Sequence, residues 1–314
     1  MKDCTAPACP EVGPGLPAPL SPVSDQQTGS VLIYNFYSSS PSNPGVENTR
    51  INLTNADPGR TAFVHLFFVD GSTCAVADST VCLTPNQTVS LEASDIDPGV
   101  SGYVVAVAVD RVSGCPIRFN SLMGDAYVKL STGHAANLGA EAFPALKDNP
   151  AACDGSATTA TLAFNGTGYG LVPRVVTLDS LPSVADGNST LLILNRVGGN
   201  LTANAESLGS VFGLLYDDLE HSYSFSFRGG CQFRQVLSST FPRTTPRLNQ
   251  VVQAGHTGWM KLSAVEDVGL LGASLNFTPR AGSSPTAYSQ GHNLHELTFT
   301  ASTTITIPVS PPGC

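Results

Sequence analysis

The hydrophobic residues of this chain fall into short runs that are separated by turn-forming residues. The runs at 49–55 (TRINLTN) and 87–94 (QTVSLEAS) alternate between apolar and polar residues, which is the period of a half-buried β-strand. The run at 102–111 (GYVVAVAVDR) is almost wholly apolar and rich in valine, as expected for a central strand buried on both faces. The pattern therefore predicts a series of β-strands in the first half.

The same pattern restarts after residue 157. Strand-like runs occur at 158–166 (TTATLAFNG), 189–195 (STLLILN) and 209–218 (GSVFGLLYDD), and the run at 222–227 (SYSFSF) alternates with period two. The best helical candidate, residues 134–146 (HAANLGAEAFPAL), contains a glycine and a proline. Because no long segment has a convincing helical period, the chain is predicted to be all-β.

Four regions follow from this pattern. Residues 1–29 contain six prolines and almost no bulky apolar residues, which predicts an extended arm without a core of its own. Residues 30–145 and 157–314 carry the strand pattern, and residues 146–156 form a linker. We expect two tandem antiparallel β-sandwich domains of immunoglobulin-like size, preceded by the proline-rich arm.

The two halves also share similar segments in the same order. GWMKLSA (258–264) resembles AYVKLST (126–132), which places Tyr127 and Trp259 at equivalent positions of one duplicated β-domain. The first half has an additional segment at 72–102 that this matching leaves without a counterpart, so we expect it to be an insert.

Composition restricts the function classes. Only 12% of the residues are charged, about half of the roughly 25% that is usual, so the surface is polar mainly through uncharged side chains. The net charge is −9 and no run of Lys and Arg occurs, which argues against nucleic-acid binding because phosphate contacts require a basic surface. No apolar run approaches the length of a membrane span, so no transmembrane segment is expected.

The chain contains an even number of widely spaced cysteines and no metal-binding Cys motif, a pattern typical of disulfides in an oxidising compartment. We predict a local Cys74–Cys82 bridge and a Cys115–Cys153 bridge. The remaining cysteines could form a Cys4–Cys9 loop and a Cys231–Cys314 bridge.

Six Asn-x-Ser/Thr sequons fit a glycosylated extracellular surface, although such sequons also arise by chance in a chain rich in Asn, Ser and Thr. The candidate acceptors are Asn52, Asn86, Asn165, Asn188, Asn200 and Asn276.

The stretch from "NTRINLTNADPGRTAFVHLFFVDGSTC" through "GYVVAVAVD" to "GCPIRFNSLMGDAYVKLSTGHAANLGAEAF" resembles uncharacterised secreted proteins of environmental bacteria. The resemblance covers roughly residues 30–145. It implies an exported bacterial β-protein. Because that group has no established activity, the resemblance transfers no site residue.

One segment carries a pair of histidines. GHNLHEL (291–297) places His292 and His295 beside Glu296. A zincin motif needs HExxH on a helix, where the two histidines share a face. Here the surroundings are typical of a turn followed by a strand, and residues three apart on a strand point to opposite faces. We therefore expect a polar loop rather than a metal site.

Two acidic clusters have the residue types that bind Ca²⁺ through oxygen ligands. Asp217, Asp218 and Glu220 lie between two strand-like runs, and Asp95 and Asp97 lie in the first half. For both clusters a solvated turn is the favoured interpretation. No cofactor-binding motif, complete catalytic motif or phosphate-binding loop is recognised, so no cofactor and no enzyme activity are predicted.

These observations favour an extracellular or cell-surface bacterial protein with a structural or interaction role. We expect a self-assembling subunit of a filament or layer whose copies contact one another through the N-terminal arm. The first alternative is a carbohydrate-binding or adhesin module, which would show an exposed aromatic platform or a calcium site. The second is a secreted hydrolase with an unrecognised site, which would show a pocket with paired carboxylates or a nucleophile and its base.

Overall fold

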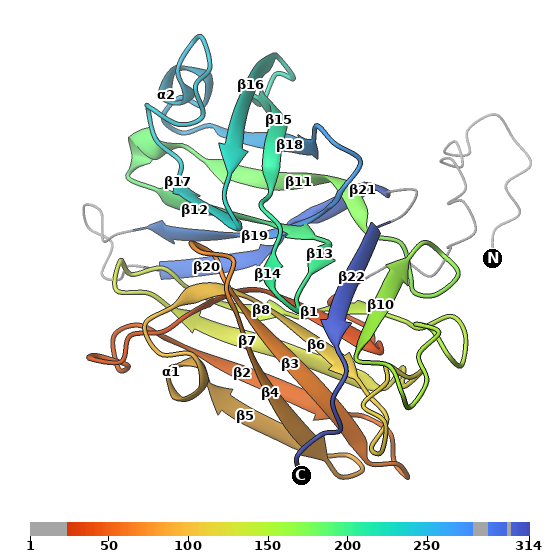
Figure 1. Ribbon diagram of the computed structural model, residues 1–314. Coiled ribbons are helices and arrows are strands. Elements are labelled where there is room, and N and C mark those ends of the chain that lie inside the picture. The colour runs from red at the N-terminus through yellow and green to blue at the C-terminus, as the bar shows by residue number, and fades with distance from the viewer. Residues whose placement is uncertain (1–23, 279–287, 300–302) are drawn as a thin grey trace, which may run out of the picture.

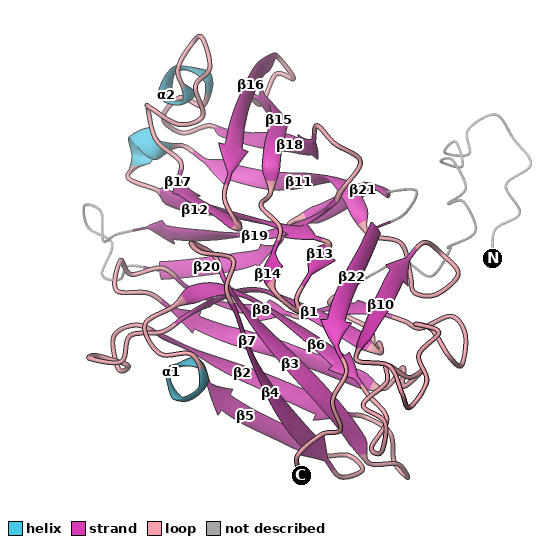
Figure 2. Ribbon diagram, viewed as in Figure 1, coloured by secondary structure: helices cyan, strands magenta, loops and turns pink. Residues whose placement is uncertain are grey.

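The computed structural model describes residues 24–278, 288–299 and 303–314 (Figure 1). Nearly all of the regular structure is β-strand, as Figure 2 shows, so the all-β prediction is confirmed. The strands form five separate sheets, which we call sheets A to E. The helical elements are single turns: α1 (Ala93–Ile96), α2 (Leu248–Val251) and the 3₁₀ turn Val184–Asp186.

The strands of each sheet are given in their spatial order. Sheet A contains β4 (Val76–Leu83), β3 (Ala62–Asp70), β6 (Ser101–Ala108), β1 (Val31–Ser38) and β9 (Glu141–Phe143). Sheet B contains β5 (Thr88–Glu92), β2 (Asn48–Asn55), β7 (Leu122–Lys129) and β8 (Ala135–Gly139). Sheet C contains β16 (Ser222–Gly229), β15 (Gly209–Tyr216), β18 (Thr257–Ala264), β11 (Pro173–Pro182) and β21 (His295–Phe299). Sheet D contains β17 (Gln232–Val236), β12 (Ser189–Val197), β19 (Gly269–Thr278) and β20 (Tyr288–Asn293). Sheet E contains β10 (Thr159–Phe164), β22 (Thr303–Pro308), β13 (Gly199–Asn200) and β14 (Asn204–Ala205).

Sheet A is buried on both faces, which explains its continuous apolar sequences. Along β1 the side chains alternate: Leu32 and Tyr34 pack into the core against sheet B, whereas Val31 and Ile33 pack into the core against sheet E. Strand β6 alternates in the same way. When a strand is covered on both faces, an apolar side chain at every position stabilises the fold because it is removed from water. This explains why GYVVAVAVDR has no polar face.

Sheet D is also buried on both faces. Leu191 and Ile193 of β12 join the core that sheets A and B share, while Leu192 and Leu194 pack against sheet C. Sheets B, C and E have one buried and one open face, and their strands accordingly alternate, as in the pattern of β18 (Thr257–Ala264). Both cores that contain residues 30–145 also contain residues beyond 157.

The prediction of two tandem immunoglobulin-like sandwiches is therefore wrong. The molecule is a five-bladed β-propeller of small sheets, in which sheets A and D each pack against neighbours on both sides. The blades are not meanders of consecutive strands, because the chain passes repeatedly between sheets A and B and later between sheets C and D. An isolated sandwich would leave the outer faces of sheets A and D in water.

The strand order of sheets A and B recurs in sheets C and D, since β4–β3–β6–β1–β9 has the same connectivity as β16–β15–β18–β11–β21. The predicted matching of segments is nevertheless wrong. Tyr127 lies on β7 of a four-stranded sheet and Trp259 on β18 of a five-stranded sheet, so the two do not occupy equivalent positions. The segment 72–102 is not an insert either, because its strands β4 and β5 have β16 and β17 as counterparts.

Three disulfides link the described cysteines. The predicted Cys115–Cys153 bridge is confirmed. The predicted Cys74–Cys82 bridge is wrong, because Cys74 pairs with Cys231 and Cys82 pairs with Cys314; this also rules out a Cys231–Cys314 bridge. Cys74 precedes β4 and Cys82 lies near its far end, so the extended strand between them keeps them too far apart to bond each other. The proposed Cys4–Cys9 loop lies outside the described residues.

A chain of buried amide side chains connects sheets A and D. The carboxamide of Asn195 on β12 donates to the backbone carbonyl of Asn35 on β1 at 2.7 Å, and Gln232 donates to the Asn195 side chain at 2.8 Å. Asn35 in turn donates to the side-chain oxygen of Asn293 at 3.0 Å. Because each buried amide has a partner, this polar network fixes the position of one sheet relative to the other.

Within residues 24–278, 288–299 and 303–314, no helix has both the length and the apolar character needed to cross a membrane.

Candidate metal centre

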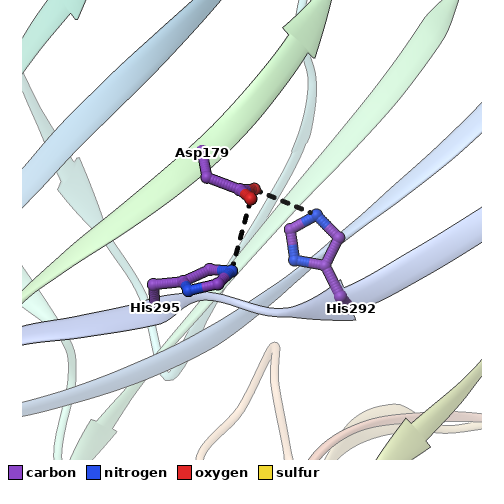
Figure 3. Close-up of side chains that lie close together, drawn as sticks. All are labelled: Asp179, His292 and His295. Atoms are coloured by element: carbon purple, nitrogen blue, oxygen red, sulfur yellow. Dashed lines mark ion pairs between the residues drawn. The ribbon is translucent and has the colours of Figure 1, made fainter. Parts of the chain in front are cut away.

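Three side chains from three strands meet at one end of sheets C and D. Asp179 lies in β11 at an irregularity of the pairing with β18, between Leu178 and Leu181. His292 lies near the end of β20, and His295 begins β21. Figure 3 shows the two imidazole rings on either side of the Asp179 carboxylate.

A change of sheet brings the two histidines together. Strand β20 belongs to sheet D and β21 to sheet C, and the chain passes from one to the other at Leu294, which is buried. The rule that residues three apart point to opposite faces holds only within one continuous strand. Because the strand ends between His292 and His295, their rings lie with centroids 5.8 Å apart, so the expected polar loop is instead a pair of strand ends.

The distances fit a shared cation. His292 Nε2 lies 3.3 Å from Asp179 Oδ1, and His295 Nε2 lies 3.3 Å from Asp179 Oδ2. The ligand atoms of the three residues all lie within 4.8 Å of one another, and no other group of three His, Cys, Asp or Glu residues in the described part of the chain does so. All three side chains are substantially exposed, so an ion could enter directly from solvent.

One hydrogen bond of His292, made by its Nδ1 atom, favours the tautomer that a metal needs. Its Nδ1 lies 2.9 Å from the backbone oxygen of Asn293. A carbonyl oxygen only accepts, so Nδ1 carries the proton and donates it. In the neutral ring this leaves a lone pair on Nε2, the atom that faces Asp179. Backbone carbonyls hold metal-binding histidines in the same way in known sites.

Two imidazole nitrogens and one carboxylate suit a divalent transition metal of the zinc type. Imidazole is a good ligand for Zn²⁺, Cu²⁺, Fe²⁺ and Ni²⁺, whereas Ca²⁺ and Mg²⁺ prefer oxygen ligands alone. Three protein ligands leave at least one coordination position for water or another ligand.

A cavity of about 530 Å³ lies beside these residues and includes His292 and His295 in its wall. Three carboxyl groups also line it: Asp25 ahead of β1, Glu141 on β9 and Glu296 on β21. Glu296 follows His295 directly, and because neighbouring residues of a strand point to opposite faces, it turns inward where His295 turns outward. The cavity thus places acidic groups behind the histidine pair.

Burial changes the ionisation of two of these acids. Loss of hydration raises the pKa of Glu141 well above its usual range, and the charges of Glu296 and Asp25 raise it further. Burial and the nearby charge of Asp25 raise the pKa of Glu296 to about 8. Near neutral pH both side chains are therefore mainly protonated.

The predicted acidic clusters lie elsewhere. Asp217, Asp218 and Glu220 occupy the turn between β15 and β16, where Asp217 Oδ1 accepts from the backbone N–H groups of Leu219 and His221. The carboxylate of Asp218 pairs with His256. These oxygens are taken up by the turn and by histidines, and the three acids do not converge on a common point.

The second cluster surrounds the short helix α1. Asp95 is exposed in its first turn, and Asp97 follows its end. The Asp97 carboxylate accepts a 2.5 Å hydrogen bond from the hydroxyl of the buried Tyr37. Asp97 therefore anchors the helix to β1.

The sequons differ in accessibility. Asn86, Asn165 and Asn200 are exposed, and Asn52 and Asn188 are half-buried. Asn276 is only 6% exposed, and its side-chain oxygen accepts from Thr190 at 3.0 Å. Of the six candidates, the three exposed residues suit glycan attachment and Asn276 does not.

Comparison of the chain with protein-family models, with curated proteins and with solved structures finds no match.

The sequence drew attention to two of the three candidate ligands, although it favoured a polar loop over a metal site there, and it did not single out the third. His292 and His295 were visible as a pair, whereas Asp179 lies in a segment, PRVVTLDSLP, that carries no motif. The feature that could have pointed to Asp179 is a pair of polar residues, Asp179 and Ser180, which are exposed and interrupt an otherwise buried strand. Such an interruption is typical of a β-bulge, which often lies beside a functional site.

Proposed function

We propose that this chain is an extracellular binding protein that holds a divalent transition-metal ion, Zn²⁺ in the first instance, through Asp179, His292 and His295. The arrangement in Figure 3 carries the proposal: two imidazole Nε2 atoms face one carboxylate, and the Asn293 carbonyl fixes the tautomer of His292. Three disulfides support an oxidising, extracellular location.

The experiment is a calorimetric titration of chelator-treated protein with Zn²⁺ near neutral pH. We expect one ion per chain, and a loss of affinity of about tenfold or more in His295→Ala and Asp179→Asn, because each change removes one of three ligands. His256→Ala is the matched control, since His256 is also exposed and paired with an aspartate, Asp218. A His256→Ala protein that loses binding while His295→Ala retains it would contradict the assignment.

The protein offers an independent optical measurement. Trp259 is the only tryptophan of the chain and lies on β18 opposite the irregular segment of β11 that carries Asp179. Cu²⁺ or Ni²⁺ in the site should therefore quench its fluorescence, and the quenching should disappear in Asp179→Asn.

The carbohydrate-binding alternative has one observation in its favour. Phe212, Tyr216 and Trp259 lie on the open face of sheet C, with Phe212 41% exposed. The rings of Tyr216 and Trp259 stack on each other at 3.8 Å, so each covers one face of the other. Titration of the Trp259 fluorescence with soluble oligosaccharides distinguishes this role from metal binding. Self-assembly through the N-terminal arm stays a prediction, because residues 1–23 lie outside the described part of the chain.

A further inference from the structure

The cavity beside the histidine pair is lined mainly by acids and amides, together with His292 and His295 themselves. Asp25, Glu141 and Glu296 approach it from three separate parts of the fold, and no lysine or arginine contributes to its wall. Its size of about 530 Å³ is that of a small-molecule site, but such sites are usually mainly apolar. The polar lining points to a charged ligand.

Glu141 is the most unusual of these residues. It is only 4% exposed and lies on β9, the edge strand of sheet A. Its carboxyl group lines the cavity, and burial, together with the charges of Glu296 and Asp25, raises its pKa well above the usual range. A buried carboxyl group without a partner is costly, so natural proteins rarely keep one unless it serves a ligand.

Glu296, on another strand that lines the cavity, is a second acid, and one of its oxygens is unsatisfied. Its Oε1 atom is buried and has no hydrogen-bond partner among the described residues. Asp25, by contrast, is held in place, since its Oδ2 accepts from the Asn293 side chain at 3.0 Å. The cavity therefore contains one anchored carboxylate and two carboxyl groups with unused acceptor capacity.

The spacing of these acids does not suit a bare metal ion. A metal needs its ligand atoms close together, and within residues 24–278, 288–299 and 303–314 only Asp179, His292 and His295 meet that condition. Carboxyl groups spread around a cavity instead match a cation that carries several N–H donors on an extended body. A primary ammonium group donates three hydrogen bonds and can be shared among several carboxylates.

We propose that this cavity binds a primary alkylammonium group, which Asp25, Glu141 and Glu296 receive by charge-assisted hydrogen bonds. The ammonium group lies inside the ring of acids, and the alkyl body extends past Leu294 toward the histidines. The three acids that receive the ammonium group are not among the three proposed metal ligands, although His292 and His295 line the same cavity. The same chemistry is offered by a free diamine and by the lysine side chain of a partner protein.

The test uses the full-length, chelator-treated protein, so that failure of metal binding does not affect it. Binding of 1,4-diaminobutane and of Nα-acetyl-lysine N-methylamide is measured by isothermal titration calorimetry near pH 8, with 1,4-butanediol as the uncharged comparison. We expect at least one amine to bind and the diol not to bind. Tighter binding of the diamine identifies a free diamine as the source, and tighter binding of the lysine derivative identifies a partner's lysine.

Variants separate the cavity from general charge effects. Glu141→Gln and Glu296→Gln keep the shape of the side chain and should each weaken amine binding about tenfold or more, since an amide cannot become the carboxylate that a bound ammonium group stabilises. Glu266→Gln, in the exposed turn after β18 and away from the cavity wall, should leave binding unchanged. Thermal unfolding of each variant verifies that it is folded.

Three outcomes overturn the proposal. The first is that neither amine binds at millimolar concentration. The second is that the diol binds as well as the amines, which would show that the cavity does not recognise charge. The third is that folded Glu141→Gln and Glu296→Gln bind the amines as tightly as the unmodified protein.

Discussion

Two glutamates show how a single residue can make stability depend on pH. Glu141 and Glu296 are buried without a cationic partner, and burial is the main cause of their raised pKa values. In the unfolded chain both groups ionise near the usual value of 4.5. Between that pH and the folded pKa, the folded protein holds more protons than the unfolded protein, so stability must fall as the pH rises.

We therefore expect the free energy of unfolding to decrease from about pH 5 to about pH 8, the window set by Glu296. Glu296→Gln cannot ionise and should be the more stable protein at the upper end, by roughly 3 to 5 kcal/mol. Urea unfolding at several pH values measures this effect. Stability that rises steadily over the same range, or a Glu296→Gln curve parallel to that of the unmodified protein, would refute it.

At the residue scale, the sequence revealed candidates but not their neighbours. His292 and His295 stood out because they are close in sequence, and their meeting point depends on the change of sheet at Leu294, which the pattern did not mark. Asp179 and Glu141 reach the same region from distant segments. Such convergence is a property of tertiary packing and leaves no local signal.

At the scale of single elements, the period of the hydrophobic pattern was a reliable guide. The alternating run at 49–55 lies within β2, and the valine-rich run at 102–111 includes all but the first residue of β6, which is buried on both faces as predicted. The helical candidate at 134–146 instead contains β8 and β9. Here short strands with small residues produced a pattern that has neither a clear helical nor a clear strand period.

Strand β12 carries a test of the connection between sheets A and D. Replacing Asn195 by alanine removes the donor to Asn35 and leaves the Gln232 side chain with only its longer, 3.3 Å hydrogen bond to the Asn35 carbonyl. Because these groups are buried, we expect a loss of roughly 2 to 4 kcal/mol in the free energy of unfolding. Asn137→Ala, at an exposed position of β8, should change it by less than about 0.5 kcal/mol. Equal effects of the two changes, measured by chemical denaturation, would show that the amide chain does not stabilise the contact.

At the scale of the whole molecule, the sequence predicted the strand content but not the number of sheets or their neighbours. The internal similarity is real at the level of strand order, since sheets C and D repeat the connectivity of sheets A and B. The similarity of the segments GWMKLSA and AYVKLST was misleading, because the two segments lie on strands that pair with different neighbours. The second faces of sheets A and D are covered by sheet E and by the contact between sheets A and D. Each of these contacts brings together residues from the first and the second half of the chain.

The disulfides test this arrangement directly. Peptide mapping without reduction should recover Cys74 with Cys231 and Cys82 with Cys314, whereas a peptide pair joining Cys74 to Cys82 would contradict the fold. Replacing both cysteines of the Cys74–Cys231 bridge by serine should lower the free energy of unfolding by roughly 2 to 5 kcal/mol, because the bridge closes a long loop. Denaturation of the double variant measures the loss.

The Cys82–Cys314 bridge has a further consequence for the lifetime of the protein among extracellular proteases. It joins Cys314 to strand β4, so residues 82–314 lie inside one covalent ring. A protease that cuts once, anywhere between these two cysteines, opens the ring but releases nothing. The nicked molecule keeps its mass, runs as a single band without reductant and separates into two fragments only when the disulfides are reduced.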